Sequence, residues 1–150
     1  MVRYRTQVLF RVLAVTLEGA MPEPKRILIV DDSSNMRRLV RINLESHSGL
    51  QVCGEAADGM EAIDAAVDLK PDLIVLDLCM PRMNGIDAAA TLHRLLPLTP
   101  IILFTLHEDI VPEKQTRAVG IKAVVSKTGA MSVLFKEVQR LLGTTRAASA

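Results

Sequence analysis

Short runs of apolar, largely β-branched residues alternate along this chain with longer segments whose apolar residues recur at helical spacing. The runs predict strands at 26–30, 50–53, 72–77, 100–105 and 123–126. The other segments predict helices, one capped by Ser33 or Ser34 and closed by Gly49, and others at 60–69, 86–96, 112–119 and 131–142. Parallel strands need crossover helices, and strands covered on both faces are apolar throughout. The alternation therefore predicts an α/β fold built on a doubly wound, five-stranded parallel sheet.

The folded domain is expected to span residues 25–142. Pro22 and Pro24 mark its beginning, because proline has no backbone donor and favours extended structure in the residue before it. Residues 1–24 are interpreted as a poorly ordered extension, and residues 143–150 as a small polar tail. Arg11 interrupts the longest apolar stretch near the start, which is shorter than the roughly 20 residues of a membrane span. We therefore expect a cytoplasmic protein without a membrane segment.

Charge and cysteine content exclude several classes of protein. The 18 Lys and Arg residues nearly balance the 17 Asp and Glu residues, so the sequence lacks the basic excess typical of direct nucleic-acid binding. Cys53 and Cys79 are too few for a disulfide framework and form no CxxC metal motif. Both thiols are interpreted as small buried residues. A chain of 150 residues buries enough surface to fold without such a staple.

Polar side chains stand where the predicted strands end. Asp31 and Asp32 follow the first strand, Asp77 ends the third, Thr105 ends the fourth, and Lys127 comes just after the fifth. Ligands of doubly wound sheets bind beyond the carboxyl ends of the strands, so these side chains are expected on one rim. Carboxylates placed close together raise one another's pKa unless a cation is present. Carboxylate oxygens are the ligands that Mg²⁺ prefers, and the sequence therefore predicts a Mg²⁺ site.

A carboxylate beside Mg²⁺, with a hydroxyl and an ammonium group nearby, is arranged to accept a phosphoryl group. Asp77 is the predicted nucleophile, because it alone comes from the middle apolar strand. Asp31 and Asp32 are adjacent in the chain, which suits them to holding the metal ion together.

Several blocks of this sequence occur in a familiar order. They are Val30-Asp31-Asp32, Asp77-Leu78-Cys79-Met80-Pro81-Arg82-Met83-Asn84-Gly85, Phe104-Thr105 and Ser126-Lys127. As a set they resemble the response regulator receiver domain of two-component signalling, over about residues 25–142. The resemblance implies a flavodoxin-like (βα)5 fold with strand order 2-1-3-4-5. It also implies a signalling domain that catalyses only its own phosphorylation and dephosphorylation.

The same resemblance assigns roles to the residues on the rim. It implies that Asp77 accepts a phosphoryl group from a histidine kinase or a phosphotransfer protein. Asp31, Asp32, Asp77 and the main-chain carbonyl of Cys79 would hold Mg²⁺, and Thr105 and Lys127 would bind phosphoryl oxygens. Phosphorylation would then alter a surface that an unidentified downstream protein, or a second copy in a homodimer, can recognise.

This chain departs from the family pattern in ways that affect signalling. Val124 stands where the family often has Tyr or Phe, so coupling through an aromatic switch is not expected. Leu106, directly after Thr105, is larger than the residue often found there and is expected to narrow access to the phosphoryl group. Cys79 and His107 occupy positions where the family tunes the lifetime of the phosphorylated state. A basic patch, Arg37, Arg38 and Arg41, is read either as a solvated helix face or as a docking site for the kinase.

Three other functions remain as alternatives. A pseudo-receiver would bind partners without phosphorylation, which the complete acidic set opposes. A haloacid dehalogenase-type hydrolase would need a second Asp two residues after the nucleophile, where this chain has Cys79. The chain is too short to include a DNA-binding domain after residue 142, but a fragment of a longer DNA-binding regulator is compatible with the sequence.

Overall fold

The computed structural model describes residues 22–143, which form a parallel sheet with the strand order β2-β1-β3-β4-β5. The predicted fold class and strand order are confirmed. The five strands are β1 (Lys25–Val30), β2 (Leu50–Ala56), β3 (Leu73–Leu76), β4 (Ile101–Thr105) and β5 (Ile121–Ser126). The extension predicted at 1–24 and the tail predicted at 143–150 lie outside the described residues, except for residues 22–24 and Gly143.

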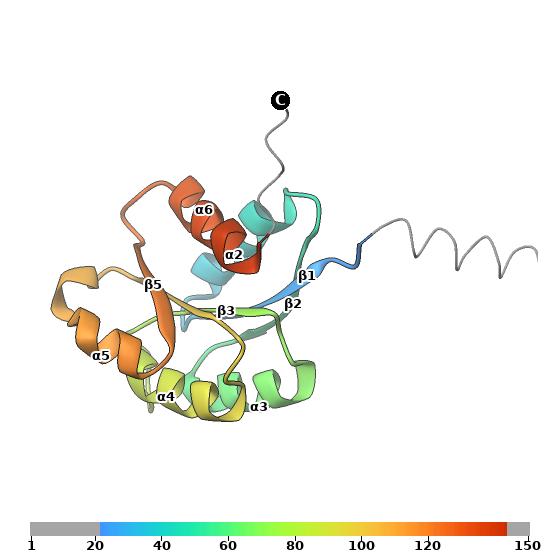
Figure 1. Ribbon diagram of the computed structural model, residues 1–150. Helices are drawn as coiled ribbons and strands as arrows, with labels where there is room; N and C mark the ends of the chain where they lie inside the picture. The colour runs from blue at the N-terminus through green and yellow to red at the C-terminus, as the bar shows by residue number, and fades with distance from the viewer. Residues whose placement is uncertain (1–21, 144–150) are drawn as a thin grey trace, which may run out of the picture.

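Helices cover both faces of the sheet (Figure 1). Helices α2 (Ser34–Glu45) and α6 (Met131–Leu142) lie on one face, while α3 (Gly59–Leu69) and α4 (Gly85–Leu95) lie on the other. The short helix α5 (Glu113–Ala118) lies beside β5 and is preceded by the 3-10 turn η1 (Glu108–Ile110). Because every pair of neighbouring strands is parallel, the carboxyl ends of all five strands meet at one edge.

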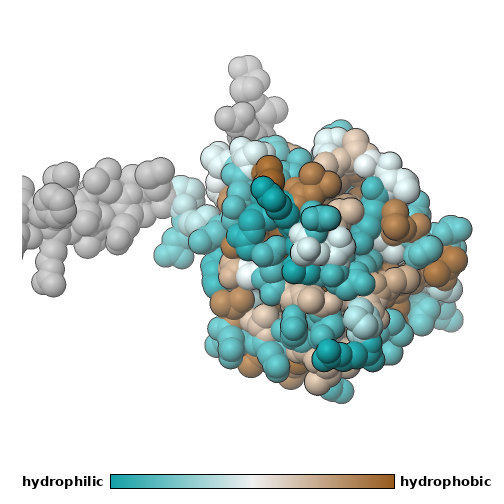
Figure 2. All heavy atoms as spheres, turned by 180° about the vertical axis from the view of Figure 1, so that it is seen from behind, coloured by the Kyte–Doolittle hydropathy of each residue, from teal (hydrophilic) through white to brown (hydrophobic). Residues whose placement is uncertain are grey.

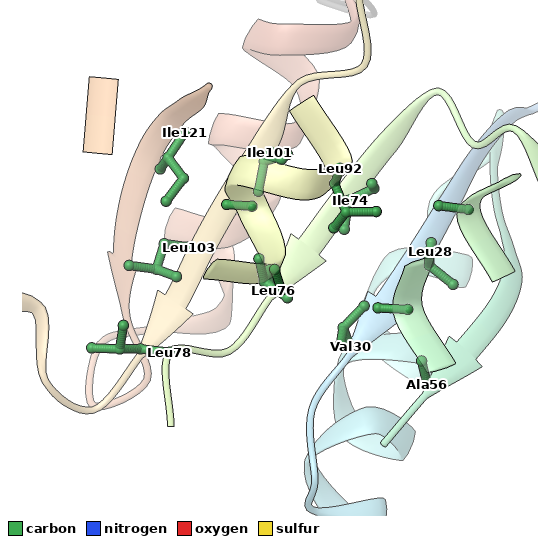
Figure 3. Packing of buried hydrophobic residues seen from close by; sticks show 14 residues of the cluster. Leu28, Val30, Ala56, Ile74, Leu76, Leu78, Leu92, Ile101, Leu103 and Ile121 are labelled. Carbon is green, nitrogen blue, oxygen red and sulfur yellow. The ribbon is translucent and has the colours of Figure 1, made fainter. Parts of the chain in front are cut away.

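The core consists of two hydrophobic clusters separated by the sheet. All four residues of β3 and all five of β4 are buried, as expected for central strands covered on both sides. Figure 3 shows one cluster, in which Leu28, Ile74 and Ile101 of neighbouring strands lie with Leu92 of α4. Burying each such side chain contributes about 1.5–3 kcal/mol. The central strands are therefore the rigid base on which the strand-end residues stand.

Three helices begin at this same edge, each with a capping side chain. The side chains of Ser33, Asp58 and Asn84 accept hydrogen bonds from backbone amides in the first turns of α2, α3 and α4. Such caps stabilise a helix by about 1 kcal/mol. Ser33 follows β1, Asp58 follows β2, and Asn84 ends the loop between β3 and α4. The caps therefore fix the loops that surround the strand ends.

The sequence prediction was wrong at several boundaries. Gly49 does not close the first helix, which ends at Glu45; Gly49 instead takes a positive φ of 86° in the turn before β2. Strand β2 runs on to Ala56, because its backbone continues to pair with β1 after an irregularity. Leu39 and Val67 belong to the helical apolar pattern of α2 and α3, yet they are 51% and 47% exposed. In α2 only the stripe that includes Val40 and Leu44 points into the core, and this stripe is narrower than the apolar pattern suggested.

The outer surface of the domain is mixed in character. Figure 2 shows hydrophobic residues in small groups separated by polar ones on the face seen from behind. No helix between residues 22 and 143 has both the length and the hydropathy required to cross a membrane.

A close backbone contact at the start of α4 gives a test of this packing. A Cβ atom added to Gly85 would lie 2.3 Å from the main-chain oxygen of Asp77. Gly85→Ala is therefore expected to lower the free energy of unfolding by about 1–3 kcal/mol, because the backbone must move. Urea unfolding measures this. Gly129→Ala is the control, because its Cβ would make an ordinary 3.6 Å contact, and its effect should stay within about 0.5 kcal/mol. Equal effects of the two substitutions would contradict the packing described.

Candidate functional site

Three carboxylates meet at the carboxyl edge of the sheet. Asp31 follows β1 and Asp77 follows the adjacent β3, where the Asp77 amide donates to the carbonyl of Val30 over 2.9 Å. Asp31, Asp32 and Asp77 each offer one oxygen atom, and these three atoms all lie within 4.8 Å of one another. Asp31 and Asp77 are buried, whereas Asp32 is exposed. The predicted convergence of these residues is therefore present in the fold.

Lys127 follows the edge strand β5, and its side chain extends past the end of β4 to this acidic group. Its Nζ lies 2.5 Å from Oδ2 of Asp31 and 3.3 Å from Oδ1 of Asp77, and its side chain is only 7% exposed. The main-chain amide of Lys127 donates to the carbonyl of Thr105 over 2.8 Å, which fixes the turn after β5. A buried carboxylate pair without a cation would be strongly destabilising, so the Lys127 ammonium is the counter-ion of the site.

Further contacts orient Asp31. Its Oδ1 accepts a hydrogen bond from the amide of Ser33, and its main-chain oxygen accepts one from Nη1 of Arg37 over 2.7 Å. Arg37 and Arg41 also form ion pairs with Glu55. These two arginines are therefore partly exposed and paired with Glu55, and are not freely solvated side chains. Of the three residues in the proposed basic patch, Arg38 is exposed and has no ion pair within the described part of the chain.

A pocket of about 290 Å³ opens over the carboxylates. Its lining residues are Asp31, Asp32, Ser33, Met36, Asp77, Cys79, Leu106, His107 and Lys127. Cys79 is exposed there and Cys53 is half-buried, so the interpretation of both as buried thiols was wrong. Met36 lines the pocket but is not among the site residues predicted from the sequence. Its place in the pocket has no sequence signal, because it depends on how α2 starts after Asp32.

Thr105 is buried at the end of β4 and does not itself line the pocket. Its hydroxyl oxygen accepts a hydrogen bond from the main-chain amide of His107 over 3.1 Å. Leu106 and His107, the next two residues, form part of the pocket wall. The Thr105 hydroxyl is thus bonded to the loop that borders the pocket.

The electrostatics of the site favour a bound cation. Burial raises the pKa of the Asp77 carboxyl, and the Asp31 carboxylate raises it further, while Lys127 acts in the opposite direction. One ammonium group therefore leaves three carboxylates incompletely neutralised. A cluster of carboxylate oxygens with residual negative charge fits a hard divalent cation such as Mg²⁺.

The raised pKa of Asp77 predicts how stability varies with pH. Ionisation of Asp77 costs more in the folded than in the unfolded chain, so its destabilising effect grows as pH rises through the raised folded-state pKa. Without divalent cations at neutral pH, Asp77→Asn should raise the thermal midpoint by about 2–5 °C, and this gain should shrink at acidic pH. Asp68→Asn, which changes an exposed carboxylate on α3, is the control. It should change neither the thermal midpoint nor its dependence on pH. A wild-type protein as stable as Asp77→Asn at neutral pH, in the presence of a chelator, would contradict this electrostatic description.

Comparison with known proteins agrees with this geometry. Residues 27–139 match the family described as the response regulator receiver domain. The chain is 36% identical over 115 residues to the chemotaxis protein CheY of Thermotoga maritima, covering 77% of this chain and 88% of that protein. It is 33% identical over 115 residues to a protein-glutamate methylesterase/protein-glutamine glutaminase of the same organism. That match covers 75% of this chain but only 33% of the methylesterase, so the chain spans about a third of the length of that relative.

Solved structures show the same relationship. The signal receiver domain of the putative response regulator NarL from Mycobacterium tuberculosis superposes with a TM-score of 0.75 at 27% identity, covering 83% of this chain and all of that one (100%). A two-component response regulator of the LuxR family from Aurantimonas sp. SI85-9A1 gives a TM-score of 0.76 at 29% identity, covering 85% and 91%. With the family match over residues 27–139, these similarities show that the chain belongs to the response regulator receiver domain family.

Proposed function

We propose that Asp77 accepts a phosphoryl group from a histidine kinase or a phosphotransfer protein, and that this modification switches a protein-interaction surface. The observation that carries the proposal is the acidic group Asp31, Asp32 and Asp77, held around one pocket with the Lys127 ammonium between two of its members. The chain is then a signalling domain of a two-component system. Its catalysis is limited to its own phosphorylation and dephosphorylation, and its location is the cytoplasm.

Asp31, Asp32, Asp77 and the main-chain carbonyl of Cys79 would hold Mg²⁺ in the pocket. The bound ion would neutralise charge on the phosphoryl oxygens. Asp32 is the exposed member of the acidic group and also lines the pocket.

In the transfer step, one carboxylate oxygen of Asp77 attacks the phosphorus atom and forms a new P–O bond. The P–N bond to the donor histidine breaks, its electron pair stays on the imidazole nitrogen, and a proton from water on the imidazole ring regenerates neutral histidine. Asp77 becomes an acyl phosphate. Lys127 Nζ, now paired with Asp31 and Asp77, is placed to pair with a phosphoryl oxygen once the Asp77 carboxylate is modified.

The switch would run through Thr105. Its hydroxyl now accepts the bond from the His107 amide, and turning that hydroxyl toward a phosphoryl oxygen would draw the loop from Leu106 to Val111 toward the pocket. The same loop borders a groove of about 390 Å³, whose residues include Glu108, Val111, Lys122 and Val124. The groove between this loop and β5 is the surface that we propose for a downstream protein or for a second copy of the chain.

The alternatives have weaker support. Membership of the receiver family excludes the dehalogenase-type hydrolase, and the complete acidic group disfavours a pseudo-receiver. A receiver that acts as part of a longer regulator is a second candidate. It is supported by the methylesterase relative, about a third of whose length this chain spans, and by a LuxR-family structural neighbour. In either case we propose that the receiver domain itself makes protein contacts and does not bind nucleic acid.

Phosphorylation of Asp77 can be tested by mass spectrometry. Incubation with acetyl phosphate or phosphoramidate and Mg²⁺ should add one phosphoryl group to the wild-type chain. The addition should disappear in Asp77→Asn and when a chelator removes the metal ion. Asp87→Asn, which changes an exposed carboxylate on α4, should be modified like the wild type. An unmodified wild type would favour the pseudo-receiver, and modification of Asp77→Asn would move the acceptor elsewhere.

The role of Lys127 is tested by measuring two things separately: phosphorylation of Asp77, and the structural change that phosphorylation causes in the loop from Leu106 to Val111. With Mg²⁺ present as the replacement cation for the acidic group, Lys127→Ala should still fold and be modified at Asp77, although more slowly, because it loses the ammonium that pairs with the phosphoryl group. Modification should no longer change the amide NMR shifts of the loop from Leu106 to Val111. Wild-type shift changes in Lys127→Ala would show that this residue does not transmit the signal.

A further inference from the structure

The loop from Leu78 to Asn84 carries the Cys79 carbonyl that we propose as a metal ligand. Both ends of this loop are fixed to the domain. The amide of Gly85 donates to the carbonyl of Leu78 over 2.8 Å, and Asn84 caps helix α4. Between these points the chain makes a tight turn, in which the Met83 amide donates to the carbonyl of Pro81. The middle of the loop therefore needs another attachment if the Cys79 carbonyl is to keep one position.

Arg82, at the tip of the loop, has an unusual backbone conformation. Its φ is 69°, in the left-handed region that costs a non-glycine residue about 1–2 kcal/mol. Such a conformation persists only where the surrounding contacts impose it. The contacts at this position come from the turn between β2 and α3, on the far side of β1 in the sheet.

Two contacts join the loop to that turn. Nη1 of Arg82 lies 3.6 Å from Oδ2 of Asp58, and a Cβ atom added to Gly59 would lie 3.0 Å from the side chain of Met83. Asp58 is the N-cap of α3, and its Oδ1 already accepts the amide of Glu61 over 2.9 Å. We call the Arg82–Asp58 pair and the Met83–Gly59 contact the loop clasp.

The burial of the two charged partners is very unequal. The Arg82 side chain is 76% exposed, whereas the Asp58 side chain is 7% exposed. An ion pair between two exposed side chains contributes little. Here, removing Arg82 would leave a buried carboxylate, because no other basic group lies within salt-bridge distance of Asp58 in the described chain. The contact is therefore worth more than its exposed arginine suggests.

We propose that Arg82 and Asp58 are positioning residues for the metal site. The clasp holds the loop so that the main-chain carbonyl of Cys79 stays in place beside Asp31 and Asp77. The two residues act through the loop and touch neither the metal ion nor the phosphoryl group. This inference rests on the proposed function, since it concerns the same Mg²⁺ site.

The sign of a mutational effect separates positioning from simple electrostatics. Arg82→Gln removes a positive charge near the acidic pocket, so charge alone would make Mg²⁺ bind more tightly. The clasp instead predicts weaker binding, by about tenfold, the low end of the effects of residues that orient metal ligands. Asp58→Asn keeps a capping side chain for α3 and should weaken binding by a similar factor. The double variant should bind Mg²⁺ with the same affinity as whichever single variant has the lower affinity, because both substitutions break the same contact.

The experiment measures Mg²⁺ affinity of the full chain by calorimetric titration, and amide hydrogen exchange of Met80, Arg82, Met83 and Asn84 in the metal-free protein. Arg82→Gln should speed exchange in this loop and lower the thermal midpoint by a few degrees at most, because Asp58 loses its ion pair but keeps the hydrogen bond from the Glu61 amide. Arg82→Lys should restore part of the affinity. Arg38→Gln, which removes an exposed arginine on α2, is the matched control and should bind Mg²⁺ at least as tightly as the wild type.

Each outcome decides one question. Unchanged or tighter Mg²⁺ binding by Arg82→Gln would overturn the clasp, and so would effects that multiply in the double variant. A wild type that binds no Mg²⁺ would reject the proposed function, and the metal-free exchange measurement would still test the clasp. Because Arg82 is highly exposed, its variants test the proposal even if Asp58→Asn fails to fold.

Discussion

The contact of Lys127 with Asp31 and Asp77 is the interaction on which the site depends. Two buried carboxylates cannot be kept close together without a cation, and the ammonium at 2.5 and 3.3 Å provides it. The three residues come from β1, β3 and the end of β5, so the contact forms only when the strand order is complete. A parallel sheet with all carboxyl ends at one edge meets this condition, and the buried strands β3 and β4 keep it rigid.

This ion pair also makes the site responsive to charge. Burial and the Asp31 carboxylate raise the pKa of Asp77 more than the Lys127 ammonium lowers it. A divalent cation and a phosphoryl group would change the balance by adding positive and negative charge at the same place, and the Lys127 ammonium would exchange carboxylate partners for phosphoryl oxygens. A domain whose buried counter-ion can change partners has a physical basis for two states.

The sequence was sufficient for the fold and for the residues at the strand ends, because both follow from local patterns. An apolar run followed by a polar residue identifies a strand end, and parallel topology brings Asp31, Asp77 and Lys127 to one edge. Contacts between loops have no such pattern. The pairing of Arg82 with Asp58 depends on a backbone turn and on the packing of Met83, and neither can be derived from spacing. The exposure of Cys79 depends on the same loop.

Position 124 has a valine and no aromatic ring, which limits how a structural change at Asp77 can be transmitted to the surface beside β5. Val124 is 38% exposed on β5, and its short side chain cannot turn between a buried and an exposed position as a ring would. The remaining connections run along the main chain. Thr105 accepts the His107 amide through its hydroxyl and the Lys127 amide through its carbonyl, so it joins the loop after β4 to the turn after β5. Any movement of Thr105 must therefore shift both segments together, and the loop after β4 also borders the groove beside β5 that we propose as the surface for a partner.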